Sequence, residues 1–276
     1  MLKPTLCFAL PFEAKPWLKL FNAKAVKQSK QMGFYQSDRV DILISGVGTY
    51  KIAAAIGWLF GQGNNKRILF NIGLSGSANF SLYNWVIPHS VAPQNNEQKP
   101  FYPEILFKSE LNTCKLLTLN TPASRDYLAN LRNTIVDMEA YGFAKSAQQF
   151  IPSTQIHFLK FISDDGADQE IDLNILEDAY ENKLHTAIAF IEQTSEILNR
   201  DFTKKELNFS EKQHISEKLK LTFSQQVQLE NVIRYVYFYG LENRLTGIDS
   251  FLNEEIKNKY QRNAILENIL HKLYHG

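Results

Sequence analysis

The first two-thirds of the chain alternates short apolar runs with segments of helical periodicity. The apolar run at Thr5–Leu10 precedes a helix-compatible stretch, and the run at Val40–Gly48 precedes small and apolar residues at helical spacing over Tyr50–Gly61. Arg67–Ala78 is another extended run, which ends in a turn of glycine and serine. Strands that alternate with helices predict an α/β layered fold with a largely buried sheet.

The same alternation continues to about residue 198. Trp85–Pro93 and Cys114–Asn120 are expected to be strands, and Gln155–Asp168 a strand that ends in an acidic loop. Thr134–Phe150 predicts a strand that turns at once into a helix. Leu173–Leu198 predicts one long amphipathic helix with a single apolar stripe.

The composition changes after Asn199, where a polar and charged segment predicts a linker. Thr222 and Gln225 then form a plausible capping box for a helix, and more amphipathic helices are expected towards the C-terminus. We therefore predict an α/β domain over residues 1–198, and a linker with a small helical module over residues 199–276.

The composition excludes several classes of function. Apolar residues make up 44% and charged residues 21% of 276, which is typical of a globular protein with a sizeable core. The net charge of +1 gives no general electrostatic attraction to nucleic acid or to an anionic membrane. Two cysteines in apolar surroundings suggest no disulfide framework, and the N-terminus resembles neither a signal peptide nor a membrane span. We expect a cytoplasmic protein.

Polar turns follow four of the expected strands. They are Ser45–Thr49, Asn71–Ser77, Asp137–Glu139 and Ile162–Asp168. Ligands of open α/β sheets bind at the carboxyl ends of the strands, so neighbouring parallel strands would bring these turns to one edge. Taken singly, the glycines could serve only to turn the chain, and Asp137 could be only a helix cap.

Three acids from distant parts of the chain would then face one cleft: Glu13, Glu139 and Asp164. Such a set suits hydrolysis of a glycosidic bond. One acid protonates the leaving group, another activates water, and a positively charged sugar-like transition state is stabilised between them.

Four motifs in order resemble the nucleoside phosphorylase superfamily, and within it the 5′-methylthioadenosine/S-adenosylhomocysteine nucleosidases. They are LISGVGTYKIAAA from Leu43, FNIGLSGSA from Phe70, VDMEAYGFA from Val136 and FISDDGAD from Phe161. The resemblance covers roughly Thr5 to Ile197. It implies a three-layer α/β/α phosphorylase-like domain with a mixed central sheet. The C-terminal residues lie outside the resemblance, and we expect them to form a small all-α module.

The resemblance also implies an activity. The protein would be a purine nucleoside N-ribosylhydrolase that acts on a 5′-modified adenosine, such as methylthioadenosine, S-adenosylhomocysteine or 5′-deoxyadenosine, without a metal or organic cofactor. Asp164 would protonate the purine, Glu13 would activate water and Glu139 would bind the ribose hydroxyls. Four other residues would border the substrate: Met138 beneath the sugar, Ser163 in the Asp164 loop, and Ser75 and Gly76 beside the water and ribose.

The chain departs from the family pattern at several positions. Asn71 stands where phosphorylases carry a phosphate-binding arginine, which favours water as the nucleophile. Leu74 replaces a small polar residue, Lys160 replaces an arginine, and Pro11–Phe12 replaces a run of acids before Glu13. The stretch from residue 118 to 133 is also shorter than the segment that supplies an aromatic stacker for the base.

Two other functions follow from these departures. Lys15 or Lys51 could supply the cation for a phosphate-dependent phosphorylase. Leu74 and Pro11–Phe12 leave open a non-catalytic nucleoside-binding protein that acts through its helical module. By resemblance we expect a homodimer, and by composition we expect no nucleic-acid or membrane partner. The C-terminal helices could dock on the catalytic domain, contribute to the dimer or bind another protein.

Overall fold

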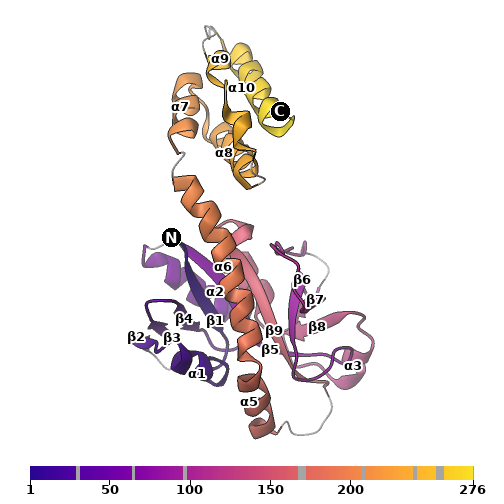
Figure 1. Ribbon diagram of the computed structural model, residues 1–276. Coiled ribbons are helices and arrows are strands. Elements are labelled where there is room, and N and C mark those ends of the chain that lie inside the picture. The colour runs from indigo at the N-terminus through magenta and orange to yellow at the C-terminus, as the bar shows by residue number, and fades with distance from the viewer. Residues whose placement is uncertain are drawn as a thin grey trace. The chain divides into compact units, whose positions relative to one another are not determined.

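The computed structural model describes residues 1–28, 32–63, 66–95, 98–166, 172–206, 209–238, 241–252 and 258–275. The chain divides into two compact units, Leu2–Ile197 and Leu198–Gly276. The first unit is an α/β layered structure (Figure 1), and the second is helical. The fold class predicted from the sequence is confirmed.

The described residues of the first unit form a nine-stranded mixed sheet, in the order β2-β3-β4-β1-β5-β8-β7-β6-β9, in which β9 also pairs with β5. The strands have these bounds: β1 Lys3–Phe8, β2 Lys24–Gln28, β3 Gly33–Gln36, β4 Asp41–Ile44, β5 Arg67–Gly76, β6 Trp85–Pro93, β7 Asn112–Thr118, β8 Thr134–Asp137 and β9 Ile156–Asp164.

Five of these strands close into a ring. The long strand β5 pairs in parallel with β1 and with β9, and its last residue pairs with Val136 of the antiparallel strand β8. The ring continues through β7 and β6 back to β9. The carboxyl ends of β5, β8 and β9 therefore meet at one place, because Gly76 pairs with both Val136 and Asp164.

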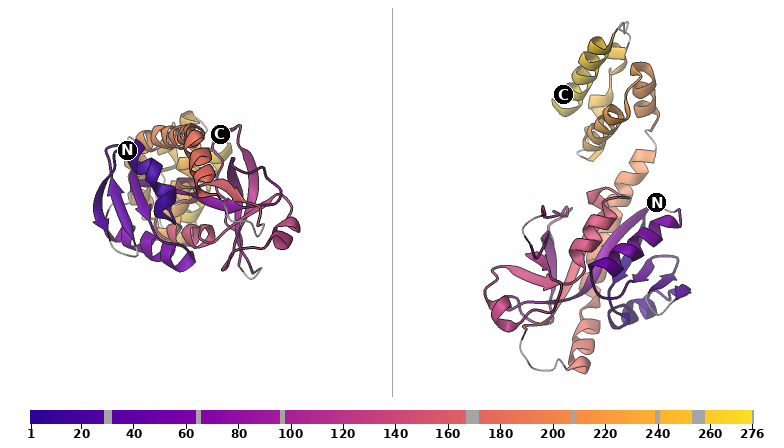
Figure 2. Two further views of the ribbon diagram at one scale, coloured as in Figure 1. Left: turned by 90° about the horizontal axis from the view of Figure 1, so that it is seen from below. Right: turned by 180° about the vertical axis from the view of Figure 1, so that it is seen from behind.

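Helices cover both faces of the sheet. They have these bounds: α1 Pro11–Leu20, α2 Thr49–Gly61, α3 Arg125–Ala129, α4 Ala140–Ala147, α5 Leu173–Asn182 and α6 Leu184–Glu206, with a 3-10 turn at Ser153–Gln155. Helices α2 and α4 pack together on one face, visible from behind in Figure 2, and share an apolar core with the strands. Helices α5 and α6 lie on the other face (Figure 1). There, Phe190 of α6 contacts Phe70 of β5, and Tyr180 of α5 contacts Trp85 of β6.

A buried ion pair lies where the parallel strands begin. Arg67 Nη1 of β5 is 2.5 Å from Asp41 Oδ2 of β4 and donates to Thr5 Oγ1 at 2.9 Å. Lys3 Nζ is 2.6 Å from the other oxygen of Asp41. This pair is at the opposite strand ends from the polar turns, where a structural role is expected.

Two expectations from the sequence were wrong. The predicted helix over Leu173–Leu198 is broken at Lys183, whose carbonyl accepts a hydrogen bond from Trp85 Nε1 at 2.9 Å. The described residues of the predicted linker are helical instead, because α6 extends to Glu206 and another helix begins at Phe209. Ile215 and Leu219 of that helix are buried one turn apart, so a short apolar stripe was hidden among the charges.

The second unit has its own apolar core. Its helices are α7 Phe209–Leu219, α8 Phe223–Phe238, α9 Asp249–Leu252 and α10 Lys259–His275, with a 3-10 turn at Glu242–Leu245. The core includes Leu229 and Val236 of α8 and Ile269 of α10. The predicted capping box forms, since the Thr222 N–H donates to Gln225 Oε1 at 3.1 Å. Among the described helices of the chain, none is both long and apolar enough to cross a membrane.

Candidate active site

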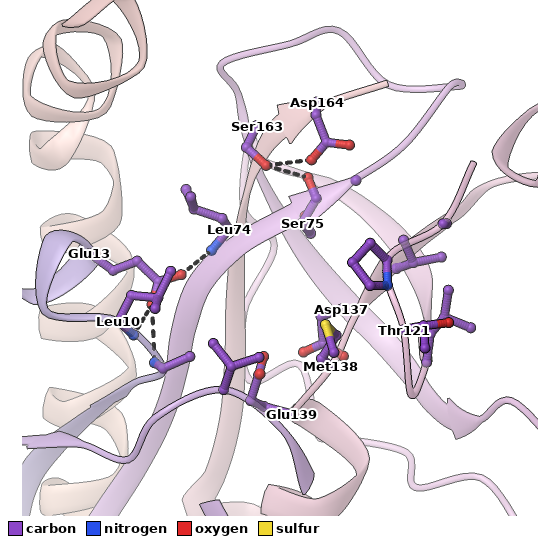
Figure 3. Close-up of a pocket in the computed structure, with 17 residues that line it drawn as sticks. Leu10, Glu13, Leu74, Ser75, Thr121, Asp137, Met138, Glu139, Ser163 and Asp164 are labelled. Atoms are coloured by element: carbon purple, nitrogen blue, oxygen red, sulfur yellow. Dashed lines mark hydrogen bonds between the residues drawn. The ribbon is translucent and has the colours of Figure 1, made fainter. Parts of the chain in front are cut away.

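A pocket of about 210 Å³ lies at the carboxyl ends of β5, β8 and β9 (Figure 3). All four polar turns predicted from the sequence contribute to it. The residues that line it are Ala9, Leu10, Glu13, Val47, Leu74, Ser75, Gly76, Leu119, Thr121, Pro122, Ala123, Val136, Asp137, Met138, Glu139, Ser163 and Asp164.

Glu13 is held almost entirely by the main chain. Its Oε2 accepts the N–H groups of Ala9 at 3.0 Å and Leu10 at 2.8 Å, and its Oε1 accepts the N–H of Leu74 at 2.8 Å. Burial raises the pKa of Glu13, and these three N–H groups oppose the rise. Since a carboxylate oxygen has two lone pairs, Oε1 keeps one acceptor position for a further donor such as water.

The place of Glu13 depends on a glycine. A Cβ at position 73 would be 2.7 Å from Glu13 Oε1, which is too close for a real contact. Gly73 therefore lets the carboxylate lie directly against strand β5. The sequence motif had marked this glycine only as part of a turn.

Both oxygens of Asp137 have protein partners. Its Oδ1 accepts the hydroxyl of Thr118 at 2.8 Å, and its Oδ2 accepts the N–H of Ala140 at 2.9 Å, as expected of a residue that caps α4. Lys160 Nζ of β9 is 2.8 Å from the same Oδ2, and both side chains are buried. Asp137 therefore stabilises the start of α4, and it is compensated by a buried ammonium group.

Glu139 lies at the start of two helices. It is the N-cap residue of α4, and its Oε1 accepts the N–H of Gly48, the N-cap residue of α2, at 2.7 Å. Burial and the neighbouring Asp137 carboxylate raise the pKa of Glu139 to about 7, while Lys160 lowers it. Among the described residues, no side chain or N–H is bonded to its Oε2, which is available to a ligand hydroxyl.

Asp164 ends strand β9 beside a serine. Ser163 Oγ donates to Asp164 Oδ2 at 2.8 Å and also contacts the carbonyl of Ser75 at 3.3 Å (Figure 3). The Gly166 N–H donates to Asp164 Oδ1 at 3.1 Å. A Cβ at Gly76 would be 3.0 Å from Asp164 Oδ1. The carboxyl group is thus oriented by a hydroxyl and a backbone N–H at the mouth of the pocket.

The pocket combines four acids with aliphatic walls. Among the lining residues that the structure describes, none is a lysine, an arginine or an aromatic residue. The aliphatic lining comes from Leu10, Val47, Leu74, Leu119 and Val136 and from the loop Thr121–Ala123. Such a surface disfavours anionic ligands and accepts a neutral or cationic ligand with an apolar part.

All seven site residues predicted from the sequence line this one pocket. They are Glu13, Ser75, Gly76, Met138, Glu139, Ser163 and Asp164. The sequence reasoning missed the aliphatic wall and the ion pair of Lys160 with Asp137. The sequence did contain a signal for the ion pair. Lys160 is the only charged residue in the apolar run from Ile156 to Ile162, and a buried charge needs a partner. Asp168, the last residue of the predicted acidic loop, lies outside the described residues.

The fold matches solved nucleosidases, although no family model and no curated protein matches the chain. A methylthioadenosine nucleosidase variant from Chlamydia trachomatis is 21% identical, with a TM-score of 0.54 over 70% of this chain and 100% of that one. The 5′-methylthioadenosine/S-adenosylhomocysteine nucleosidase of Neisseria meningitidis, solved with methylthio-immucillin-A, is 17% identical with a TM-score of 0.58 over 70% and 100%. The Arabidopsis thaliana 5′-methylthioadenosine nucleosidase is 16% identical, with a TM-score of 0.57 over 69% and 96%. The expected phosphorylase-type fold is therefore confirmed.

Proposed function

We propose that the protein is a hydrolase of N-glycosidic bonds, and specifically a nucleosidase for a 5′-modified adenosine. The observation that carries this proposal is the pocket itself, where Glu13, Glu139 and Asp164 converge from three separate strand ends. The similarity in fold to nucleosidases supports the same reaction class. The aliphatic wall favours an apolar substituent such as methylthio.

Each acid has a distinct part in the proposed reaction. Asp164 gives a proton to N7 of the purine, so that the base leaves with the electron pair of the broken N9–C1′ bond. Water adds to C1′ and its proton passes to Glu13 Oε1, which retains an acceptor position. Glu139 accepts hydrogen bonds from the ribose hydroxyls through its Oε2.

The charge of the pocket favours water over phosphate as the nucleophile. A phosphate dianion requires a fixed cation, commonly an arginine that binds two of its oxygens. The described lining residues supply none, and Lys160 is already paired with Asp137. Asn71, at the position of the phosphorylase arginine, is buried within β5. The phosphorylase alternative therefore has less support than hydrolysis.

The test is adenine release from 5′-methylthioadenosine, S-adenosylhomocysteine, 5′-deoxyadenosine and adenosine, each with and without phosphate. We expect release without phosphate and a fall of at least about 100-fold in kcat/KM for Asp164→Asn, since general acid catalysis contributes about 10²–10⁴. Asp172→Asn is the matched control, because Asp172 only caps α5. Release that requires phosphate would select a phosphorylase instead.

One observation favours a second candidate, a protein that binds nucleosides without cleaving them. Leu74 places an aliphatic side chain in the pocket beside Glu13, where bound water would need further hydrogen-bond partners. Binding of methylthioadenosine with no release of adenine from any nucleoside, at any phosphate concentration, would select this function.

A further inference from the structure

Lys160 is a buried cation among three acids. Its side chain is 2% exposed and its partner Asp137 is 1% exposed, and they are 2.8 Å apart. Lys160 lies on β9 opposite Gly73 of β5, the strand against which Glu13 rests. The ammonium group therefore lies beneath the pocket, and it is not a lining residue.

The charges around Lys160 come from several elements. Asp137 ends β8, Glu139 begins α4 and Glu13 belongs to α1, and each of these acids interacts electrostatically with Lys160. Burial alone would lower the pKa of Lys160, but these acids raise it above its ordinary value. Tyr180 of α5 is the further titratable group near Glu13, and its buried hydroxyl is neutral. One cation thus faces three carboxyl groups.

The three acids differ in the donors and cations that offset their negative charge. Glu13 has three backbone N–H donors, whereas Asp137 has Lys160, a hydroxyl and an N–H. Glu139 has one N–H donor and is adjacent to Asp137. If Asp137 lost its cation, its charge would act fully on Glu139 across a buried region of low dielectric constant.

We propose that Lys160 is a positioning residue whose buried charge offsets that of Asp137 and also acts directly on Glu139, and that it thereby favours the ionised form of Glu139, which binds the ribose hydroxyls. The inference deepens the proposed function, on which the ribose role of Glu139 rests. Lys160 does not line the pocket in which substrate would bind. Its effect is on the charge state of the acid that does.

The direct test is a titration of the Glu139 side-chain carboxyl by ¹³C NMR, with the signal identified by its loss in Glu139→Gln. We expect Lys160→Met to raise the midpoint of this titration by about one pH unit or more, since a neighbouring opposite charge has an effect of that size. Lys160→Arg keeps the charge and should leave the midpoint near that of the wild type. The low-pH limb of adenine release should move with the midpoint.

A second comparison covers the case in which Lys160→Met leaves Asp137 unpaired and does not fold. Asp137→Asn and the double variant Asp137→Asn/Lys160→Met both lack the Asp137 charge, and they differ only at Lys160. The midpoint should be higher in the double variant by about one pH unit. Equal midpoints in folded proteins, in either comparison, would make Lys160 a purely structural residue.

Arg67→Met is the matched control, because it breaks a buried ion pair at the other strand ends. It should lower the stability of the protein and leave the Glu139 titration unchanged. A midpoint that moved in Arg67→Met as far as in Lys160→Met would also overturn the proposal. The NMR result does not depend on turnover, so absence of adenine release would reject the nucleosidase and not the role of Lys160 in the charge of Glu139.

Discussion

At the scale of single residues, the site depends on the Glu13 carboxylate, which lies directly against the backbone of Gly73. In Gly73→Ala, the new methyl group would be 2.7 Å from Glu13 Oε1, so the carboxylate must move away from strand β5. We expect kcat/KM for adenine release to fall by about 10–100-fold, because small displacements of a catalytic group have effects of this size.

The control for this prediction is Gly57→Ala in α2, where an added Cβ has no atom within 4 Å. It should keep full activity and raise the free energy of unfolding by about 0.5–1 kcal/mol, since alanine is favoured over glycine in a helix. Unchanged activity in Gly73→Ala would show that the observed position of Glu13 is not needed for turnover.

For single residues, the sequence shows which acids are present but not which groups offset the charge of each acid. Glu13, Glu139 and Asp164 follow apolar runs, so their convergence could be predicted from strand ends. The three N–H donors of Glu13 depend on the path of the backbone at Ala9, Leu10 and Leu74, which no residue type encodes. Long-range pairing of this kind follows from topology.

At the scale of elements, the close approach of two helices holds Glu139. A Cβ at Gly142 of α4 would be 2.8 Å from the carbonyl oxygen and 2.9 Å from the Cα of Thr49, the first residue of α2. In Gly142→Ala the helices must separate, which weakens the hydrogen bond from Gly48 to Glu139. We expect a loss of about 1–3 kcal/mol in the free energy of unfolding, as for other overpacked sites.

Urea unfolding measures the free energy of unfolding, and calorimetry measures the affinity for methylthioadenosine. Both quantities should fall in Gly142→Ala. Gly61→Ala, at the end of α2, is the matched control, because its Cβ would have no atom within 4 Å. Normal nucleoside affinity in a destabilised Gly142→Ala would separate helix packing from the function of Glu139.

Elements with strong apolar periodicity could be predicted from the sequence, and weakly patterned ones could not. Strands β2 and β3 were missed because they are short. Val26 of β2 is exposed, and only the first two residues of β3 are buried. The break at Lys183 was missed because the partner of its carbonyl, the indole of Trp85, is distant in sequence. Closure of the strand ring likewise depends on pairing between β5 and β9, which periodicity does not specify.

At the scale of the whole molecule, two buried groups should give opposite pH dependences. Burial lowers the pKa of His157 to about 4 from an ordinary 6.5, so stability from this group is lost as the pH falls from 6.5 towards 4. Burial and Asp137 raise the pKa of Glu139 to about 7 from 4.5, so its protonated form stabilises the fold at low pH, and that stability is lost as the pH rises towards 7.

Each contribution amounts to about 3 kcal/mol, and the two largely cancel between pH 4.5 and 6.5. We expect urea midpoints of Glu139→Gln to rise with pH in this range, and those of His157→Phe to fall. Phenylalanine suits this position because His157 stacks on Phe70 and, among the residues that the structure describes, none is hydrogen-bonded to its Nε2. Parallel pH profiles in both variants and the wild type would contradict these assignments.

The main-chain coordination of Glu13 has a consequence for how such a site can diverge. Its three donors are N–H groups, which nearly every amino acid supplies at positions 9, 10 and 74. Only proline lacks this donor. Side chains at these positions can therefore change while the carboxylate keeps its place. A lineage could in this way change what its pocket admits and preserve the geometry of its acid.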